Sequence, residues 1–189
     1  MKKKITAFAG SSSRHSINKQ LTEYALSFFP ESEYEINLLD LNDFEMPLFS
    51  VDKEKEQGYP QEAHRFLKEI GDADLIVCSL AEHNRSYSAA FKNLYDWCSR
   101  IEVKLFQNKP MLLMSTSPGG YGGGNVMNTA KTFFPQFAAY VLETFSLPKF
   151  HDNFKEGKIA DEELNTRFVE TIKRFQQQVA EGSYKEEGK

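Results

Sequence analysis

The chain lacks an excess of basic residues, and it lacks long apolar runs. Its 189 residues include 27 Asp and Glu against 23 Lys and Arg, which gives a formal net charge of −4. Nucleic acid or an anionic membrane surface would favour a basic face, so neither partner is expected. No stretch approaches the ~20 apolar residues of a membrane span, and the basic residues 2–4 precede a strand-length run rather than a signal-peptide core. We therefore expect a cytoplasmic protein.

Cysteine is scarce, with two residues in the whole chain. Cys78 and Cys98 form no CxxC pair, and no cluster of His and Cys at metal-ligand spacing surrounds them. Lone cysteines of this kind are usually reduced and buried, although a ligand or a nucleophile is the alternative for each. The sequence thus predicts no metal site.

Two common nucleotide-binding motifs are also missing. The glycine-rich segment 117–124 contains no GKS or GKT, which excludes a nucleoside-triphosphate P-loop. No GxGxxG follows the first apolar run, so the dinucleotide fingerprint is absent as well.

A candidate anion site is present near the start of the chain. Residues 5–18 read ITAFAGSSSRHSIN, an apolar strand-like run followed by hydroxyl residues and the beginning of a helix. Hydroxyl groups beside the free N–H groups of a helix N-terminus favour a phosphate. The alternative is a solvated turn in which Ser16 is the N-cap. These residues alone leave both interpretations open.

Apolar periodicity predicts five strands that alternate with helices. The strands are expected at 5–9, 34–38, 75–80, 111–115 and 140–145, and the helices at 17–28 (ended by Pro30), 60–70, 88–100, 124–134 (stopped or kinked by Pro135) and 162–179. Residues 42–59 show no regular period and are expected to form a long mobile loop that could be one wall of a site.

This alternation is typical of a parallel α/β sheet with right-handed crossovers. The length fits one domain, expected over 1–182 with a disordered tail at 183–189. Ligands of such sheets bind at the carboxyl ends of the strands. Two further loops at those ends look suited to a ligand, namely the polar and aromatic 81–87 and the glycine-rich 117–124, although a flexible solvent loop would also explain the glycines.

The three loops together resemble those of the NAD(P)H-dependent FMN reductase family of flavodoxin-like proteins, which includes chromate, quinone and azo-dye reductases. Residues 10–18 follow the family's G-S-x-R-x-x-S-x-N loop except that Ser13 stands where arginine is usual, with Arg14 available to compensate. The family's P-E-Y-N and L-K-N-x-x-D-W segments correspond to 81–84 and 91–97, with departures at Ala81 and His83. The S-P-G-G-x-G-G loop is intact at 117–123.

This resemblance implies a flavodoxin-like, doubly wound, five-stranded parallel sheet of order 2-1-3-4-5 with helices on both faces. It also implies FMN as cofactor and NAD(P)H as co-substrate, with no catalytic side chain because the flavin carries the chemistry. The FMN phosphate would lie against Ser11, Ser13, Ser16 and Asn18, the isoalloxazine against Glu82, His83 and Asn84, and its pyrimidine edge against Gly119, Gly120 and Tyr121. Arg14, Ile17, Ala81 and Ser117 complete the implied cofactor-binding set.

The implied activity is hydride transfer from NAD(P)H through FMN to quinones, azo dyes, flavins or similar small-molecule acceptors. Because the three loops are all occupied by one flavin, donor and acceptor are expected to bind in turn, in a ping-pong mechanism. Family analogy suggests a homodimer or homotetramer. A flavodoxin-type electron carrier is the main alternative, but its T-x-T-G-x-T loop is absent; a receiver domain would need clustered acids after the first strand. An interaction module without cofactor remains open.

Overall fold

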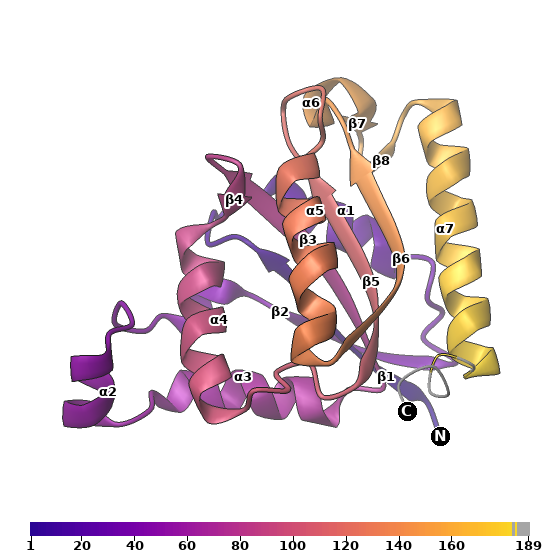
Figure 1. Ribbon diagram of the computed structural model, residues 1–189. Helices are drawn as coiled ribbons and strands as arrows, with labels where there is room; N and C mark the ends of the chain where they lie inside the picture. The colour runs from indigo at the N-terminus through magenta and orange to yellow at the C-terminus, as the bar shows by residue number, and fades with distance from the viewer. Residues whose placement is uncertain (183, 185–189) are drawn as a thin grey trace.

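Five parallel strands form the centre of the computed structural model, which describes residues 1–182 and 184 (Figure 1). Their order in the sheet is β2-β1-β3-β5-β6. Leaving out the short β4, which pairs antiparallel with the end of β3, this is the predicted order 2-1-3-4-5, so the predicted fold is confirmed. The five strands are β1 (Lys3–Gly10), β2 (Tyr34–Leu39), β3 (Leu75–His83), β5 (Lys109–Thr116) and β6 (Ala139–Leu147).

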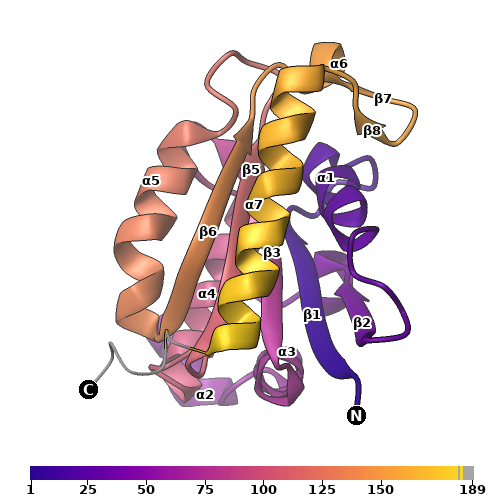
Figure 2. The same cartoon turned by 90° about the vertical axis from the view of Figure 1, so that its right-hand side faces the viewer.

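Helices cover both faces of this sheet. Helices α1 and α7 pack on one face of the sheet, and α3, α4 and α5 pack on the other; Figure 2 shows α7 in front of the sheet and α5 on its other side. The main helices are α1 (Ile17–Leu26), α3 (Gln61–Asp72), α4 (Ala89–Ile101), α5 (Gly124–Phe133) and α7 (Glu162–Glu181). The shorter elements are η1 (Leu41–Phe44), α2 (Val51–Gln57), β4 (Ser86–Tyr87), η2 (Phe134–Phe137), α6 (Phe150–Asn153), β7 (Phe154–Lys155) and β8 (Lys158–Ile159).

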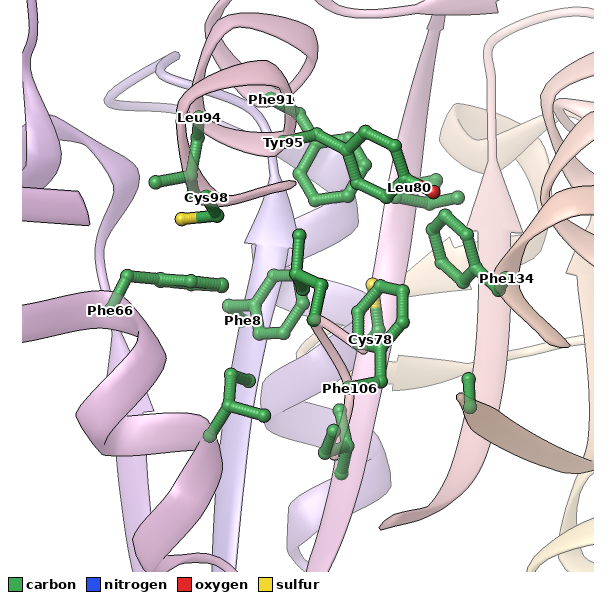
Figure 3. Close-up of a cluster of buried hydrophobic side chains, with 14 of the residues drawn as sticks. Phe8, Phe66, Cys78, Leu80, Phe91, Leu94, Tyr95, Cys98, Phe106 and Phe134 are labelled. Atoms are coloured by element: carbon green, nitrogen blue, oxygen red, sulfur yellow. The ribbon is translucent and has the colours of Figure 1, made fainter. Parts of the chain in front are cut away.

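The middle parts of the central strands β3 and β5 are mostly apolar because both of their faces are buried. Successive side chains of a strand point to opposite faces, so neighbours on β3 enter different cores. Ile76, Cys78 and Leu80 join the cluster under α3, α4 and α5, part of which Figure 3 shows. Leu75 and Val77 join the cluster under α1 and α7. The sheet is therefore shared by two hydrophobic clusters.

Both cysteines are free and buried, as predicted. Cys78 lies on β3 and Cys98 on α4, on the same side of the sheet (Figure 3). Burial raises the pKa of Cys78 well above its ordinary value and raises that of Cys98 to about 12. Thiols in such surroundings stay protonated and are poor nucleophiles.

The predicted long loop at 42–59 is wrong, because this segment contains most of η1 and the whole of α2. The side chains of Asp40 and Ser50 cap these two helices by accepting hydrogen bonds from Asn42 N and Lys53 N. Of the seven residues of α2, none is buried, and Figure 1 shows this helix at the edge of the molecule. A helix without a buried face has no apolar stripe, so periodicity gave no signal for it.

Other boundaries differ less from prediction. Helix α1 ends at Leu26, and two turn hydrogen bonds, from Phe28 N and Phe29 N, lead the chain to Pro30. Helix α5 stops before Pro135 as predicted, and the chain continues as η2. The predicted tail at 183–189 lies outside the described residues apart from 184. In the described part of the chain, no helix is both long enough and apolar enough to span a membrane.

Candidate functional site

A pocket of about 260 Å³ opens at the carboxyl ends of β1, β3 and β5. It brings together most of the predicted site residues, from all three loops. Those in its lining are Ser11, Ser13, Ser16, Ile17, Asn18, Ala81, Glu82, His83 and Ser117, and the structure adds His15, Thr116 and Pro118. Arg14, Asn84, Gly119, Gly120 and Tyr121 were predicted as well but lie outside this lining.

The hydroxyl groups of the first loop are held in place by backbone donors. Ser13 N donates to Ser11 Oγ at 3.2 Å, and His15 N donates to Ser13 Oγ at 3.3 Å. Ser16 Oγ accepts from Lys19 N at 3.2 Å. Within residues 1–182 and 184, none of these three hydroxyls donates a hydrogen bond. Each therefore has a proton available for an anion.

The N-terminus of α1 supplies further donors at the same place. Ser16 is its N-cap, so the capping role considered from the sequence is confirmed. The N–H groups of Ile17 and Asn18 have no hydrogen-bond acceptor among the described residues. These groups carry the positive end of the helix dipole. Ser16 can therefore cap α1 while the free hydroxyls and N–H groups beside it still bind a phosphate.

Asn18 has a second function, because its side chain joins three elements. Its Oδ1 accepts hydrogen bonds from Ser79 Oγ at 2.8 Å and from Thr116 N at 3.0 Å, and its Nδ2 donates to Thr116 O at 3.2 Å. The residue is 2% exposed. Its amide thus fixes α1 against the ends of β3 and β5. The predicted contact with a phosphate remains a prediction, for which the backbone N–H is the free donor.

Glu82 also has a structural role that the sequence did not reveal. Its Oε2 accepts from Val126 N at 2.9 Å, and its Oε1 accepts from Asn125 Nδ2 at 3.0 Å. The N-cap residue of α5 is Gly123, which has no side chain to cap the helix. A carboxylate from β3 takes that place, where the helix dipole favours a negative charge. In the sequence, the only sign of this role is that Gly123 has no side chain with which to cap α5.

His83 and Asn84 are separated by a tight hairpin. His83 pairs with Ser86 across β3 and β4, and the two turn residues, Asn84 and Arg85, have φ values of 51° and 66°. Such left-handed pairs are typical of a type I′ turn. The turn keeps His83 in the pocket lining and places Asn84 at the exposed tip. The predicted contact of Asn84 with flavin stays a prediction.

The glycines of 117–124 differ in how closely the fold constrains them. Gly122 has φ +61°, and a Cβ there would lie 2.9 Å from the backbone of Leu147. A Cβ on Gly124 would lie 2.5 Å from the Tyr121 ring, whose hydroxyl accepts from Asn128 Nδ2 at 3.2 Å. A Cβ on Gly120 would meet no atom within 4 Å. The fold therefore accounts for Gly122 and Gly124 but not for Gly120.

The two Lys or Arg side chains nearest in sequence to the first-loop serines, Arg14 and Lys19, do not line the pocket. Lys19 Nζ lies 2.7 Å from Asp40 Oδ2, and this hydrogen bond lowers the pKa of Asp40 and raises that of Lys19. Arg14 is exposed and outside the lining. Among the described residues that line the pocket there is no Lys or Arg, and the protonatable bases are His15 and His83.

The chain is similar to known proteins in both sequence and structure. The sequence model of the family described as NADPH-dependent FMN reductase matches residues 3–152. The chain is 28% identical over 176 residues to an NADPH:quinone oxidoreductase of Arabidopsis thaliana, covering 89% of this chain and 88% of that protein. It is 30% identical over 158 residues to a quinone reductase of Escherichia coli, covering 84% and 81%.

Solved structures show the same fold at lower identity. The flavoenzyme NAD(P)H:(acceptor) oxidoreductase FerB of Paracoccus denitrificans has a TM-score of 0.69 at 22% identity, covering 93% of this chain and 98% of that one. An azoreductase of Bacillus anthracis has a TM-score of 0.66 at 18% identity, covering 93% and 99%.

Proposed function

The chain belongs to the NADPH-dependent FMN reductase family, and from this membership we propose that it reduces quinones with NAD(P)H by a ping-pong mechanism. It is an FMN-dependent oxidoreductase that uses NAD(P)H. Quinones are the acceptors named for its relatives from Arabidopsis thaliana and Escherichia coli, and azo dyes and free flavins are further candidates.

The observation that carries this proposal is the donor set of the first loop. Free hydroxyl protons on Ser11, Ser13 and Ser16 accompany the free N–H groups at the start of α1. Neutral donors grouped at a helix N-terminus suit a terminal phosphate monoester. FMN carries its phosphate at the end of its ribityl chain, so the pocket residues fit this cofactor. His83 and Ser117, at the ends of β3 and β5, line the same pocket as these serines and would border the flavin ring.

When bound in this pocket, FMN would supply the redox chemistry that links a nicotinamide to the acceptor. The residues of the chain would bind this cofactor and orient it. The hydroxyls of the first loop hold the phosphate, the hairpin carrying His83 borders the ring, and the glycine-rich loop allows a flat ring to approach the backbone. Backbone N–H groups aimed at the ring's pyrimidine edge would favour the negative charge of reduced flavin. No side chain is required as general acid or base.

The ping-pong order follows from the number of loops. The loops after β1, β3 and β5 all serve one flavin, so nicotinamide and acceptor would share its exposed face and bind in turn. A homodimer or homotetramer also belongs to this proposal and rests on family analogy. The cytoplasmic location expected from the sequence belongs to it as well.

The first test is flavin binding by two adjacent serine variants. Ser13 lines the pocket, whereas Ser12 faces a neighbouring pocket, and both are exposed. We expect Ser13→Glu to abolish FMN binding, because a carboxylate would lie beside the phosphate, and Ser12→Glu to retain it. Fluorescence titration with FMN measures both. Equal loss in the two variants, or no binding by the unaltered protein, would contradict the proposed site.

Steady-state kinetics test the reaction. With NADH or NADPH and a benzoquinone as the two substrates, double-reciprocal plots should be parallel. Intersecting lines would indicate a ternary complex with a separate dinucleotide site. A flavodoxin-type electron carrier would bind FMN but show no turnover with this pair.

A further inference from the structure

A buried serine at the start of α4 connects this helix to the first loop. Ser88 is 2% exposed and lies outside the lining of the pocket. It is the N-cap of α4, because its Oγ accepts a hydrogen bond from Phe91 N at 3.2 Å. Capping uses this hydroxyl only as an acceptor, so its proton is left for a second partner.

The second partner is the carbonyl of Gly10, the last residue of β1. Ser88 Oγ donates to Gly10 O at 2.7 Å, in a contact between residues 78 positions apart. At the other end of the same peptide group, Ser11 N donates to Ala9 O at 2.8 Å. The peptide group that joins Gly10 to Ser11 is thus held by both its carbonyl and its N–H. Because a peptide group is planar, these two bonds fix the direction in which the chain leaves β1.

Close packing holds Gly10 at the same place. A Cβ on Gly10 would lie 2.8 Å from Leu80 Cδ2 and 3.4 Å from Phe91 Cγ. Phe91 belongs to the first turn of α4, the helix that Ser88 caps. The start of α4 and the end of β1 therefore meet at Gly10, through one buried hydrogen bond and through this packing.

Further hydrogen bonds connect Gly10 to the hydroxyls that are proposed to bind the phosphate. Ser11 Oγ accepts from Ser13 N, and Ser13 Oγ accepts from His15 N. Each bond places one residue of the loop relative to an earlier one. Among the described residues no Lys or Arg lines the pocket, so a phosphate would be bound by neutral donors that must point to one place. A displacement of Gly10 would move these donors with it.

We propose that Ser88 is a positioning residue for the FMN phosphate: its hydroxyl fixes the peptide group between Gly10 and Ser11 and so keeps the donors of the first loop in place. This inference rests on the proposed function, since it needs FMN in the pocket. The competing interpretation is that Ser88 only caps α4. The two roles are separable, because a cap affects the stability of the protein, whereas positioning affects how tightly the phosphate is bound.

The experiment compares FMN with riboflavin, which lacks the phosphate. Protein freed of flavin is titrated with each compound, and flavin fluorescence gives the two dissociation constants. The ratio of the riboflavin constant to the FMN constant isolates the contribution of the phosphate. In Ser88→Ala we expect this ratio to fall about three- to tenfold, the effect of losing about one hydrogen bond, while riboflavin binding changes by less than about twofold.

Two further variants separate positioning from capping. Ser88→Gly keeps most of the capping preference of serine but has no hydroxyl to donate, so it should lower the ratio as much as Ser88→Ala does, at a smaller loss of stability. Asp161→Ala removes the N-cap of α7, whose carboxylate accepts from Leu164 N at 2.8 Å. Because α7 packs in the other hydrophobic cluster, this variant should be less stable in urea but keep the ratio of the unaltered protein.

The outcomes distinguish the two roles of Ser88 from each other and from failure of the proposed function. An unchanged ratio in either Ser88 variant would overturn the positioning role, and so would an equal fall in Asp161→Ala, because phosphate binding would then follow overall stability. If the unaltered protein still binds FMN and reduces quinones, only the role of Ser88 is wrong in these cases. If the unaltered protein does not bind FMN, or binds riboflavin equally well, the proposed phosphate site is wrong as well.

Discussion

At the scale of single residues, the pocket combines side chains that can bind a ligand with side chains that hold the pocket together. The first-loop serines have free hydroxyl protons, whereas Asn18 and Glu82 use their polar atoms within the protein. Asn18 is the more buried of the two, and its three hydrogen bonds satisfy both backbone groups of Thr116. Its contribution should therefore appear as stability, even without flavin.

Asn18→Ala should lower the free energy of unfolding by about 2–3 kcal/mol, because it removes the three hydrogen bonds of a buried amide, two of them to backbone groups of Thr116. Urea unfolding of the flavin-free protein measures this loss. Asn128→Ala is the matched control, since Asn128 is an exposed residue of α5 and should change stability by less than about 0.5 kcal/mol. A change at Asn18 as small as that at Asn128 would show that its hydrogen bonds contribute little.

At the scale of elements, the β5–α5 connection is the part of the site most constrained by its surroundings. Gly122 sits against the backbone that follows β6, and its carbonyl accepts a hydrogen bond from Ser115 Oγ at 2.8 Å. The N-terminus of α5 is capped from β3 by Glu82. The loop is thus anchored on both neighbouring strands, while Gly119 and Gly120 are exposed and a Cβ on Gly120 would meet no atom within 4 Å.

Two alanine substitutions in this loop should affect different properties, one the stability of the protein and the other its affinity for FMN. Gly122→Ala should lower the free energy of unfolding by about 2–4 kcal/mol, because it combines a left-handed φ with a clash against the Leu147 backbone. Gly120→Ala should leave stability within about 0.5 kcal/mol, yet weaken FMN binding by about tenfold if the flavin edge lies there. Urea unfolding and flavin titration measure the two effects. Equal destabilisation by both variants would contradict this assignment.

At the scale of the whole molecule, two hydrophobic clusters lie on opposite faces of one sheet. Trp97, the only tryptophan of the chain, is 1% exposed and belongs to the cluster under α3, α4 and α5. Phe168 of α7 belongs to the other cluster. Because β1, β3 and β5 contribute side chains to both, loss of either cluster exposes the strands that the other needs. The predicted single domain should therefore unfold as one unit.

Trp97 fluorescence and far-UV circular dichroism should give the same urea midpoint and slope, because the first reports one cluster and the second reports helices on both faces. A second probe sharpens the test. Phe168→Trp in a Trp97→Phe background reports the opposite cluster and should unfold together with the dichroism signal of the same variant. Separate transitions in either protein would show that the two faces unfold independently.

Much of the fold was predictable because its signals are local. The strand of residues 75–80 is apolar except for Ser79, as is typical of a buried parallel strand. The stripe of α7 that includes Phe168 and Ile172 repeats at helical spacing. Helix α2 was missed because it buries no side chain, and the β7–β8 hairpin because each of its strands has two residues. Short or fully exposed elements leave no periodic pattern to detect.

The sequence by itself determined the strands, their alternation with helices, and the three loops at which polar side chains could meet. Tertiary structure decided which of those side chains remain free. The amide of Asn18 and the carboxylate of Glu82 are used by partners 98 and 44 residues away, at Thr116 and Val126, and the turn at Asn84 leaves His83 in the pocket. It also placed His15, and not Arg14, in the lining. Hydrogen bonds between distant segments depend on how strands and helices pack, and no local pattern of residues specifies them.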